Sequence, residues 1–330
     1  MCLHPIPVRY SNAYTAKTGF KTHLVPCGKC WQCLQDYQRA WECRLLVHLR
    51  DVGKGIFFTL TYNDDSVPLN VDSETGDSYR SVRKYQLKRF FKSCRDSLYR
   101  DRLQTGLSWF ITSEYGPLTL RPHYHGIIFN IDEIDFVLYF LDPWRKLYGF
   151  TSHTVLSFGS SESRRRCRYV AKYCAKANFE NPLVKAGKVE PTFHIISKGI
   201  GKSYLNEQSI NYHLAGFVDS PCSNGVYSTE YLERLLQSMS FNLNGRDYKL
   251  PRYYRETVFK DRKFLQSAFA DYVSTRSVLL RESKLESLQS HGISASEAHK
   301  IILDQEISET VSKDRELADR FSRELSRSKI

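Results

Sequence analysis

Two histidines and a glutamate within residues 109–129, WFITSEYGPLTLRPHYHGIIF, have the residue types and the spacing of a metal site. The segment predicts two strands joined by a tight turn. His123 and His125 lie two residues apart on the second strand, so both imidazoles project from one face of the sheet. Folding of the hairpin brings Glu114, near the end of the first strand, beside His123. Together the three side chains could bind a divalent cation.

A second group of reactive side chains occupies the basic segment RRRCRYVAKYCAK, residues 164–176. Tyr169 and Tyr173 are four residues apart, which places them on one face of a helix. Lys172 and Lys176 each follow a tyrosine by three residues. A neighbouring ammonium group favours the phenolate and can hold a phosphate oxygen. The arrangement suits transesterification of a phosphodiester by two interchangeable nucleophiles.

Each of these patterns also has an ordinary structural interpretation. A His-X-His pair is common on strands, two tyrosines at helical spacing often pack in a core, and an arginine-rich helix is often a solvated or DNA-facing surface. The combination is more informative than its parts. A metal triad on one face of a sheet, with a basic tyrosine helix packed near it, favours a catalytic site.

The cysteine cluster CGKCWQC offers a different metal site. Cys27, Cys30 and Cys33 are each separated by two residues, and Cys2 or His4 could supply a fourth ligand. The alternatives are a structural zinc site and three free thiols at the start of a helix. An iron–sulfur cluster is a less favoured third alternative.

Composition narrows the class of protein. The chain has 330 residues, a formal net charge of +12 and 13% aromatic residues, which favours a polyanionic partner, either nucleic acid or an acidic membrane surface. No apolar run approaches the roughly 20 residues that span a bilayer, and residues 1–7 lack the apolar core of a signal peptide. The odd total of 9 cysteines argues against a disulfide framework. We therefore expect a soluble intracellular protein.

The order of the expected elements predicts the fold class. Strands and helices alternate as strand, helix, strand, strand, helix and strand, which matches the split βαβ or ferredoxin-like order. In that α+β topology two helices cover one face of an antiparallel sheet, and the first and third strands are central neighbours. The histidines would then lie on the open face. After a helix at 34–49, the expected strands are 55–62, 109–115, 122–129 and 151–158, and the later helices are 82–98, 134–148 and 164–177.

Three regions are expected along the chain. Residues 1–54 form an extended N-terminal arm, the cysteine cluster and a helix. Residues 55–203 form the core, in which 67–80 is a polar loop. Residues 204–330 form a mainly helical, highly charged C-terminal extension, whose final part is expected to be a solvated helix or tail.

Several of these motifs together resemble the HUH endonuclease superfamily. The resemblance is carried by FTLTY at residues 58–62, the SEYG and RPHYHG pair, and YVAKY at residues 169–173. The two-tyrosine form is similar to rolling-circle replication initiators. With the N-terminal PCGKCWQC, the chain looks most like the replication initiators of small single-stranded DNA phages, the gokushovirus-type Microviridae. The resemblance covers about residues 1–203.

The resemblance implies a role for each candidate residue. His123 and His125 would bind Mg²⁺ or Mn²⁺, and Glu114 stands where an acidic residue often completes that site. Tyr169 or Tyr173 would attack the viral strand at the origin, leaving a 5′-phosphotyrosyl protein and a free 3′-hydroxyl. The second tyrosine would later cleave the regenerated origin, so that the single-stranded product is circularised.

The implied partners are single-stranded DNA, the replication origin, a host DNA polymerase and a host helicase, in the cytoplasm of a bacterial host. Lys172 and Lys176 would position phosphate. Two alternatives remain open: a non-enzymatic single-strand-binding module with an RNA-recognition fold, and a transposase or relaxase of the same superfamily. The binding module would need stacking rings on the exposed sheet face, where the sequence places the two histidines.

Overall fold

The computed structural model describes residues 6–10, 21–102, 105–116, 119–176, 182–215, 229–260 and 282–327. The chain divides into two compact units. The sheet-containing unit comprises Tyr37–Asn206 and Asn242–Pro251 and carries the candidate histidines and tyrosines. The other unit comprises Met1–Asp36, Glu207–Phe241 and Arg252–Ile330.

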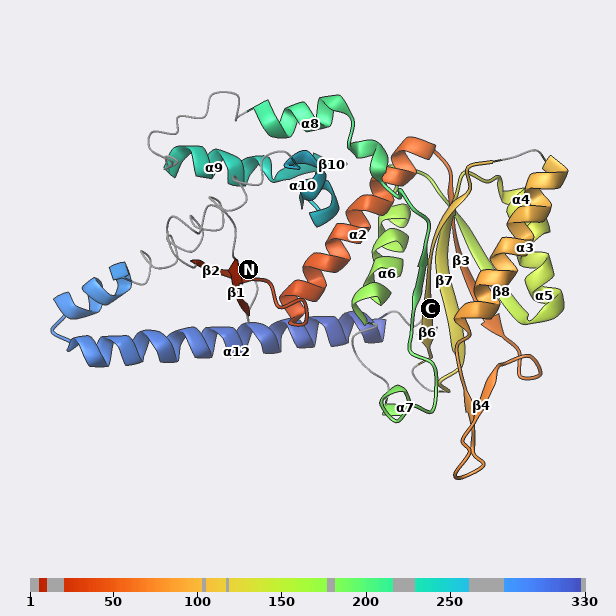
Figure 1. Ribbon diagram of the computed structural model, residues 1–330, viewed down its shortest axis with the longest axis horizontal. Helices are drawn as coiled ribbons and strands as arrows, with labels where there is room; N and C mark the ends of the chain where they lie inside the picture. Colours follow the sequence, from red (N-terminus) through yellow and green to blue (C-terminus); the bar gives the residue numbers. More distant parts are fainter. Residues whose placement is uncertain are drawn as a thin grey trace. The chain divides into compact units, whose positions relative to one another are not determined.

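A five-stranded antiparallel sheet forms the centre of the first unit (Figure 1). The strands follow the order β8-β3-β7-β6-β9, which is the expected ferredoxin-like order with one strand added at the edge. The α+β class is therefore confirmed, and so is the pairing of the first and third predicted strands. The strands are β3 (Gly55–Tyr62), β6 (Ser108–Tyr115), β7 (Pro122–Phe129), β8 (Gly149–Leu156) and β9 (His194–Ile196).

The central strands alternate between two buried environments. On β3, Phe58, Leu60 and Tyr62 enter the main hydrophobic core, whereas Thr59 and Thr61 point to the opposite face. Burial on both sides explains why this strand is almost continuously apolar and β-branched. The sequence defines such a strand well, and its predicted bounds agree with the structure.

Three helical segments cover the core side of the sheet. They are α3 (Lys84–Arg102), α4 (Glu133–Phe136) and α5 (Asp142–Leu147), with one π-helical turn, η1 (Val137–Leu141), joining the last two. Tyrosine hydroxyls anchor the start of α3 to the sheet. The Val82 N–H donates to Tyr115 Oη at 3.1 Å, and the Arg83 N–H donates to Tyr124 Oη at 3.0 Å. Tyr124 lies between the two histidines in the sequence, and its side chain supports the fold from the opposite face.

The histidine face of the sheet is not open, as the sequence had led us to expect. Helix α6 (Ser161–Lys176) packs against β6 and β7, and its partner α2 (Trp31–Val52) contributes Trp41, whose ring lies 4.9 Å from that of Phe110. Figure 1 shows α2 and α6 on the side of the sheet opposite α3 and α5. This second layer forms because apolar side chains such as Phe57 and Phe110 also lie on this face and are buried there.

Two short elements were not foreseen. The predicted polar loop at 67–80 contains a small hairpin of β4 (Leu69–Val71) and β5 (Ser78–Arg80). The fifth strand, β9, lies in a stretch expected to be loop-rich. Strands of three residues are too short for a periodic signal, and their pairing depends on long-range contacts. The sheet-containing unit also includes α7 (Pro182–Lys185), the 3₁₀ turn η2 (Lys202–Tyr204) and β11 (Arg246–Lys249).

The other unit is mainly helical, as expected for the C-terminal region. Its N-terminal part contains an antiparallel pair of β1 (Ile6–Tyr10) and β2 (Lys21–Val25), where the sequence had suggested an extended arm. None of the helices in the described ranges combines the length and the hydrophobicity needed to cross a bilayer. Its helices are α8 (Glu207–Leu214), α9 (Thr229–Ser238), α10 (Arg252–Val258) and the 33-residue α12 (Ala295–Arg327), and β10 (Ser240–Leu243) leads into β11.

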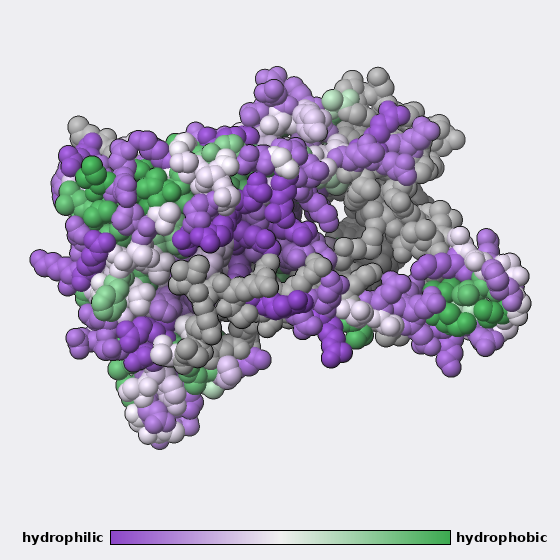
Figure 2. All heavy atoms as spheres, turned by 180° about the vertical axis from the view of Figure 1, so that it is seen from behind, coloured by the Kyte–Doolittle hydropathy of each residue, from purple (hydrophilic) through white to green (hydrophobic). Residues whose placement is uncertain are grey.

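Exposed apolar side chains gather over α4 and η1. Ile134 and Leu138 are 79% and 49% exposed, and Figure 2 shows a hydrophobic patch on the side of the sheet-containing unit where these elements lie. The patch is on the core-helix side of the sheet, away from the histidines. It therefore takes no part in the candidate site.

Gly126, which follows His125, allows the core to approach the histidine strand. A Cβ atom at this position would lie 2.5 Å from Phe58 Cζ and 3.0 Å from the Phe110 carbonyl oxygen. We expect Gly126→Ala to destabilise the protein by about 1–3 kcal/mol, because backbone and a buried ring would both have to shift. Chemical denaturation with Ser152→Ala, an exposed strand position, as the control would measure it. An unchanged midpoint for Gly126→Ala would contradict this close packing.

Candidate active site

The pairing register aligns the candidate metal ligands in two rows across β3, β7 and β6. One row contains Thr61, His123 and Glu114, and the other contains Thr59, His125 and Thr112. Directly opposed residues of an antiparallel sheet share a face. The predicted neighbourhood of Glu114 and His123 is therefore present.

Both imidazole rings are held by threonine hydroxyls of β3. Thr59 Oγ1 lies 3.0 Å from His125 Nδ1, and Thr61 Oγ1 lies 3.1 Å from His123 Nδ1. When each Nδ1–H donates to its threonine, the Nε2 lone pair is left available to a cation. Such outer partners fix the tautomer and the orientation of metal-binding histidines.

The two tyrosines of α6 lie against His125. Tyr173 Oη donates to Tyr169 Oη at 2.9 Å, and Tyr169 Oη lies 3.5 Å from His125 Nε2. Glu114 Oε2 is 3.3 Å from the same His125 nitrogen. Two phenols, an imidazole and a carboxylate thus converge at one point between the helix and the sheet.

Burial governs the ionisation of this cluster. Desolvation raises the pKa of Tyr169 to about 12, with the Glu114 carboxylate adding to the rise and a hydrogen bond from Tyr173 opposing it. Desolvation and the Glu114 carboxylate also raise the pKa of Tyr173. Desolvation, with repulsion from His125, lowers the pKa of His123, so that this ring is neutral at pH 7. A cation at this place would offset the carboxylate and favour both phenolates.

The two lysines of the tyrosine helix differ in what can be described. Lys172 is 4% exposed, and its Nζ lies 5.9 Å from the Tyr169 ring centroid and 5.8 Å from that of Tyr173. Its ammonium group is therefore shared by both phenols rather than assigned to one. The backbone of Lys176 ends α6, and its side chain lies outside the described part of the structure.

The histidine and glutamate side chains fit a hard divalent cation. They supply two imidazoles with anchored Nδ1 atoms and a carboxylate, and the His123 and His125 ring centroids are 6.3 Å apart. Two buried polar atoms beside them, Thr112 Oγ1 and His194 Nδ1, have no hydrogen-bond partner among the described residues. Unsatisfied buried polar atoms are uncommon in folded proteins and are typical of functional sites.

The thiol sulfurs of Cys27, Cys30 and Cys33 all lie within 4.8 Å of one another, closer than the histidine and glutamate atoms. Cys27 Sγ accepts the backbone N–H groups of Lys29 and Cys30 at 3.4 and 3.3 Å. Gly28 makes this tight turn possible with a φ of +73°. The predicted fourth ligands, Cys2 and His4, lie outside the described residues.

Sequence analysis assigned Thr59 and Thr61 only a structural role in a core strand. Their hydroxyls instead contact the two histidines, which the predicted pairing of 55–62 with 122–129 could have indicated. Phe57 was also missed: its ring lies 5.9 Å from that of Tyr169, beneath the Arg166 guanidinium at 4.6 Å. These contacts form part of the surroundings of Tyr169.

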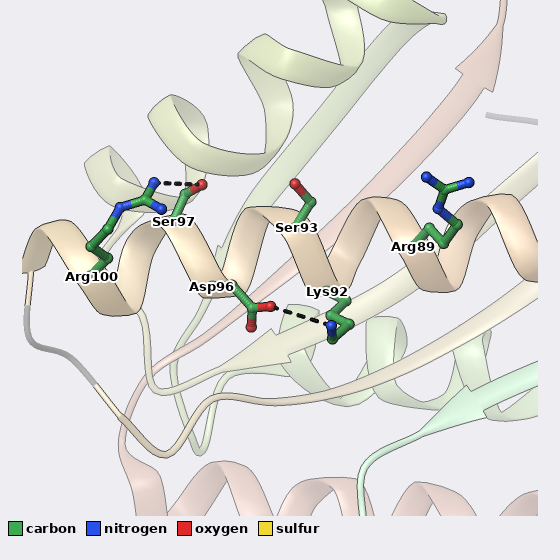
Figure 3. A pocket seen from close by; sticks show the side chains of 6 residues that line it. All are labelled: Arg89, Lys92, Ser93, Asp96, Ser97 and Arg100. Atoms are coloured by element: carbon green, nitrogen blue, oxygen red, sulfur yellow. Dashed lines mark hydrogen bonds and ion pairs between the residues drawn. The ribbon is translucent and has the colours of Figure 1, made fainter.

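A shallow hollow along the outer side of α3 is unrelated to this cluster. Figure 3 shows that its polar side chains partly pair with one another, Lys92 with Asp96 and Arg100 with Ser97. Because α3 covers the opposite face of the sheet, these groups lie far from the tyrosines. The lining residues are Arg89, Lys92, Ser93, Asp96, Ser97 and Arg100.

Comparison with known proteins places the site within a matched segment. Residues 55–178 match the family model of the replication-associated protein ORF2. The chain is 25% identical over 304 residues to replication-associated protein ORF2 of Spiroplasma virus 4, covering 82% of this chain and 92% of that protein. It is 24% identical over 285 residues to replication-associated protein VP4 of Bdellovibrio phage phiMH2K, covering 79% and 78%. No solved structure matches the chain.

The threonine contacts generate a test. We expect Thr59→Val and Thr61→Val each to weaken Mn²⁺ binding by about 10- to 100-fold, because the imidazoles lose their outer hydrogen-bond partners while side-chain volume is kept. Titration calorimetry would measure the affinity, with Thr154→Val on β8 as the control. Equal Mn²⁺ affinity in all three variants would contradict the assigned role.

Proposed function

We propose that this chain, whose residues 55–178 belong to the replication-associated protein ORF2 family, initiates replication of a single-stranded DNA phage genome by nicking the viral strand at its origin. The observation that carries the proposal is the convergence of Tyr169, Tyr173, His125 and Glu114. A nucleophile pair beside a cation-binding group is what a metal-assisted phosphodiester transesterase requires.

His123, His125 and Glu114 would hold Mg²⁺ or Mn²⁺. When bound there, the cation polarises the scissile phosphate and stabilises the charge that develops on its oxygens. Thr59 and Thr61 keep the imidazoles in the ligand tautomer. Helix α6 excludes much of the solvent, which strengthens these electrostatic interactions.

Tyr169 is the better placed of the two nucleophiles. It is less buried than Tyr173, and its hydroxyl lies next to His125 and accepts the hydrogen bond from Tyr173. That bond stabilises the phenolate of Tyr169. The phenolate oxygen attacks phosphorus, the bond to the 3′ oxygen breaks, and the 3′ oxygen takes up a proton. The products are a 5′-phosphotyrosyl protein and a 3′-hydroxyl.

Tyr173 then serves the second cleavage. It lies one helical turn along α6, and its ring stacks on that of His125 with centroids 5.3 Å apart. After one round of synthesis it would attack the regenerated origin, and the released 3′-hydroxyl would attack the first phosphotyrosine to close a single-stranded circle. Lys172 favours either phenolate, since its ammonium is about equally distant from both rings. Lys176 is proposed to position phosphate.

The proposed partners follow from this reaction. The 3′-hydroxyl needs a DNA polymerase, and strand displacement needs a helicase, both supplied by the host in whose cytoplasm the protein would act. The net charge of +12 suits binding to single-stranded origin DNA. A transposase or relaxase of the same chemistry remains the enzymatic alternative, and the two phage relatives favour replication.

The tyrosine assignment has a direct test. With origin single-stranded DNA and Mg²⁺ or Mn²⁺, the wild-type protein is expected to form an adduct that survives a denaturing gel. Tyr169→Phe should reduce first cleavage at least 100-fold, because the best-placed nucleophile is lost, whereas Tyr173→Phe should still cleave and fail in strand joining. An adduct in the Tyr169→Phe/Tyr173→Phe double variant would contradict the assignment.

A further variant separates the enzyme from a non-enzymatic binding module. His123→Ala should lose cleavage and keep DNA binding, since the histidine contributes to cation binding and not to DNA affinity. Anisotropy of labelled DNA measured beside the cleavage assay gives both quantities. A wild-type protein that binds single strands and forms no adduct under any divalent cation would favour the binding module.

We also propose that Cys27, Cys30 and Cys33 bind a structural Zn²⁺. Two backbone N–H groups already point at Cys27 Sγ, which stabilises a thiolate, and the three sulfurs are grouped as a metal requires. A fourth ligand from Cys2 or His4 would complete a tetrahedral site.

Metal analysis tests the zinc site. Purified protein should contain about one zinc per chain by the usual stoichiometry of such sites, and Cys30→Ser should lose it and unfold at a lower temperature. Cys94→Ser, at a buried cysteine of α3, is the control and should retain zinc. Zinc-free wild-type protein with unchanged thermal stability would rule out this proposal.

A further inference from the structure

Helix α6 does not extend over the whole histidine face of the sheet. It packs against β6 and β7, whereas β8 lies at the edge beyond β3. Figure 1 shows β8 on the side of the sheet away from α6. A strip of the same face that carries the candidate active site is therefore uncovered by α6.

An aromatic side chain lies on this strip. Phe150 of β8 is 64% exposed and pairs with Thr61, which in turn pairs with His123. Directly paired residues share a face, so the Phe150 side chain and the His123 imidazole lie on one side of the sheet. Their strands are separated by β3 alone, which places the two residues about 10 Å apart at the usual strand spacing.

The neighbouring positions support this orientation. Thr151 accepts a hydrogen bond from Arg145 of α5 at 2.7 Å, and His153 lies 2.8 Å from Glu133 of α4, so these two side chains point to the core-helix face. By alternation, Phe150 and Ser152 point to the histidine face, and both are exposed. The ring is thus on the catalytic side and accessible.

We propose that Phe150 stacks on a base of the single-stranded DNA next to the scissile phosphate, a step that rests on the proposed function. The histidines and lysine contact phosphate and provide no surface for a base, whereas an exposed ring beside them does. Base stacking on aromatic side chains is largely independent of sequence and contributes about 1–3 kcal/mol per base. Phe150 is therefore a positioning residue, which holds the strand so that its phosphate reaches Tyr169.

This assignment also revises the argument against a binding module. Stacking rings were expected to be absent from the exposed part of this face, and one is present. In the proposed enzyme the ring and the nucleophile act together, because the base anchors the nucleotide whose phosphate is cleaved.

A labelled oligothymidine tests the inference through binding alone. The Tyr169→Phe/Tyr173→Phe protein, which cannot react, provides the background, and anisotropy without divalent cation gives the affinity. Adding Phe150→Ala should weaken binding about 5- to 100-fold, the affinity equivalent of one lost stack, and Phe150→Trp should restore it. The control is Tyr85→Ala, at an aromatic residue of α3 that is 72% exposed.

Unchanged affinity in Phe150→Ala, or an equal loss in Tyr85→Ala, would overturn the inference. So would a change in oligomeric state of Phe150→Ala by gel filtration, which would assign the ring to self-association. Because the readout is binding, it is independent of nicking. A wild-type protein that forms no adduct, with Phe150→Ala still weakened, would refute the proposed function and leave the stacking surface standing.

Discussion

The antiparallel register of β3, β7 and β6 is the constraint on which the site depends. Thr59 meets His125 and Thr61 meets His123 only in this register, and Glu114 is placed opposite His123 by the same pairing. A shift of one residue would turn every one of these side chains to the other face. The core opposes such a shift, since it would also expose Phe58 and Tyr124, which are fully buried. Hydrophobic packing on one face therefore fixes the polar geometry on the other.

Burial gives the tyrosine cluster its chemical character. The phenols are held between a helix and a sheet, close to a carboxylate, so that in the protein alone both phenolates are disfavoured. Reactivity is then conditional on positive charge brought into the site, by the cation together with Lys172. This arrangement limits attack by the tyrosines when substrate and cation are missing, in line with the general use of perturbed pKa values at functional sites.

The sequence was informative where periodicity and residue type agree. Residues 55–62 and 122–129 are buried on both faces and strongly β-forming, and their bounds and pairing could be predicted. The His-X-His and Tyr-X₃-Tyr spacings identified side chains that the structure brings together. Short strands such as β9, the cover of α2 and α6 over the histidine face, and the contacts of Thr59 and Thr61 could not be predicted with the same success. Each depends on contacts between segments far apart in the chain, which local patterns do not encode.

The hydrogen bond between the two phenols has a direction, from Tyr173 to Tyr169, and this makes two chemically identical groups unequal. Once Tyr169 carries a phosphoryl ester, its oxygen is a poorer acceptor and Tyr173 no longer has the same partner. The second hydroxyl then has the freedom to turn toward a new substrate. Covalent occupancy of one side chain thereby changes the state of the other, and the helix can record whether the first strand has already been cut.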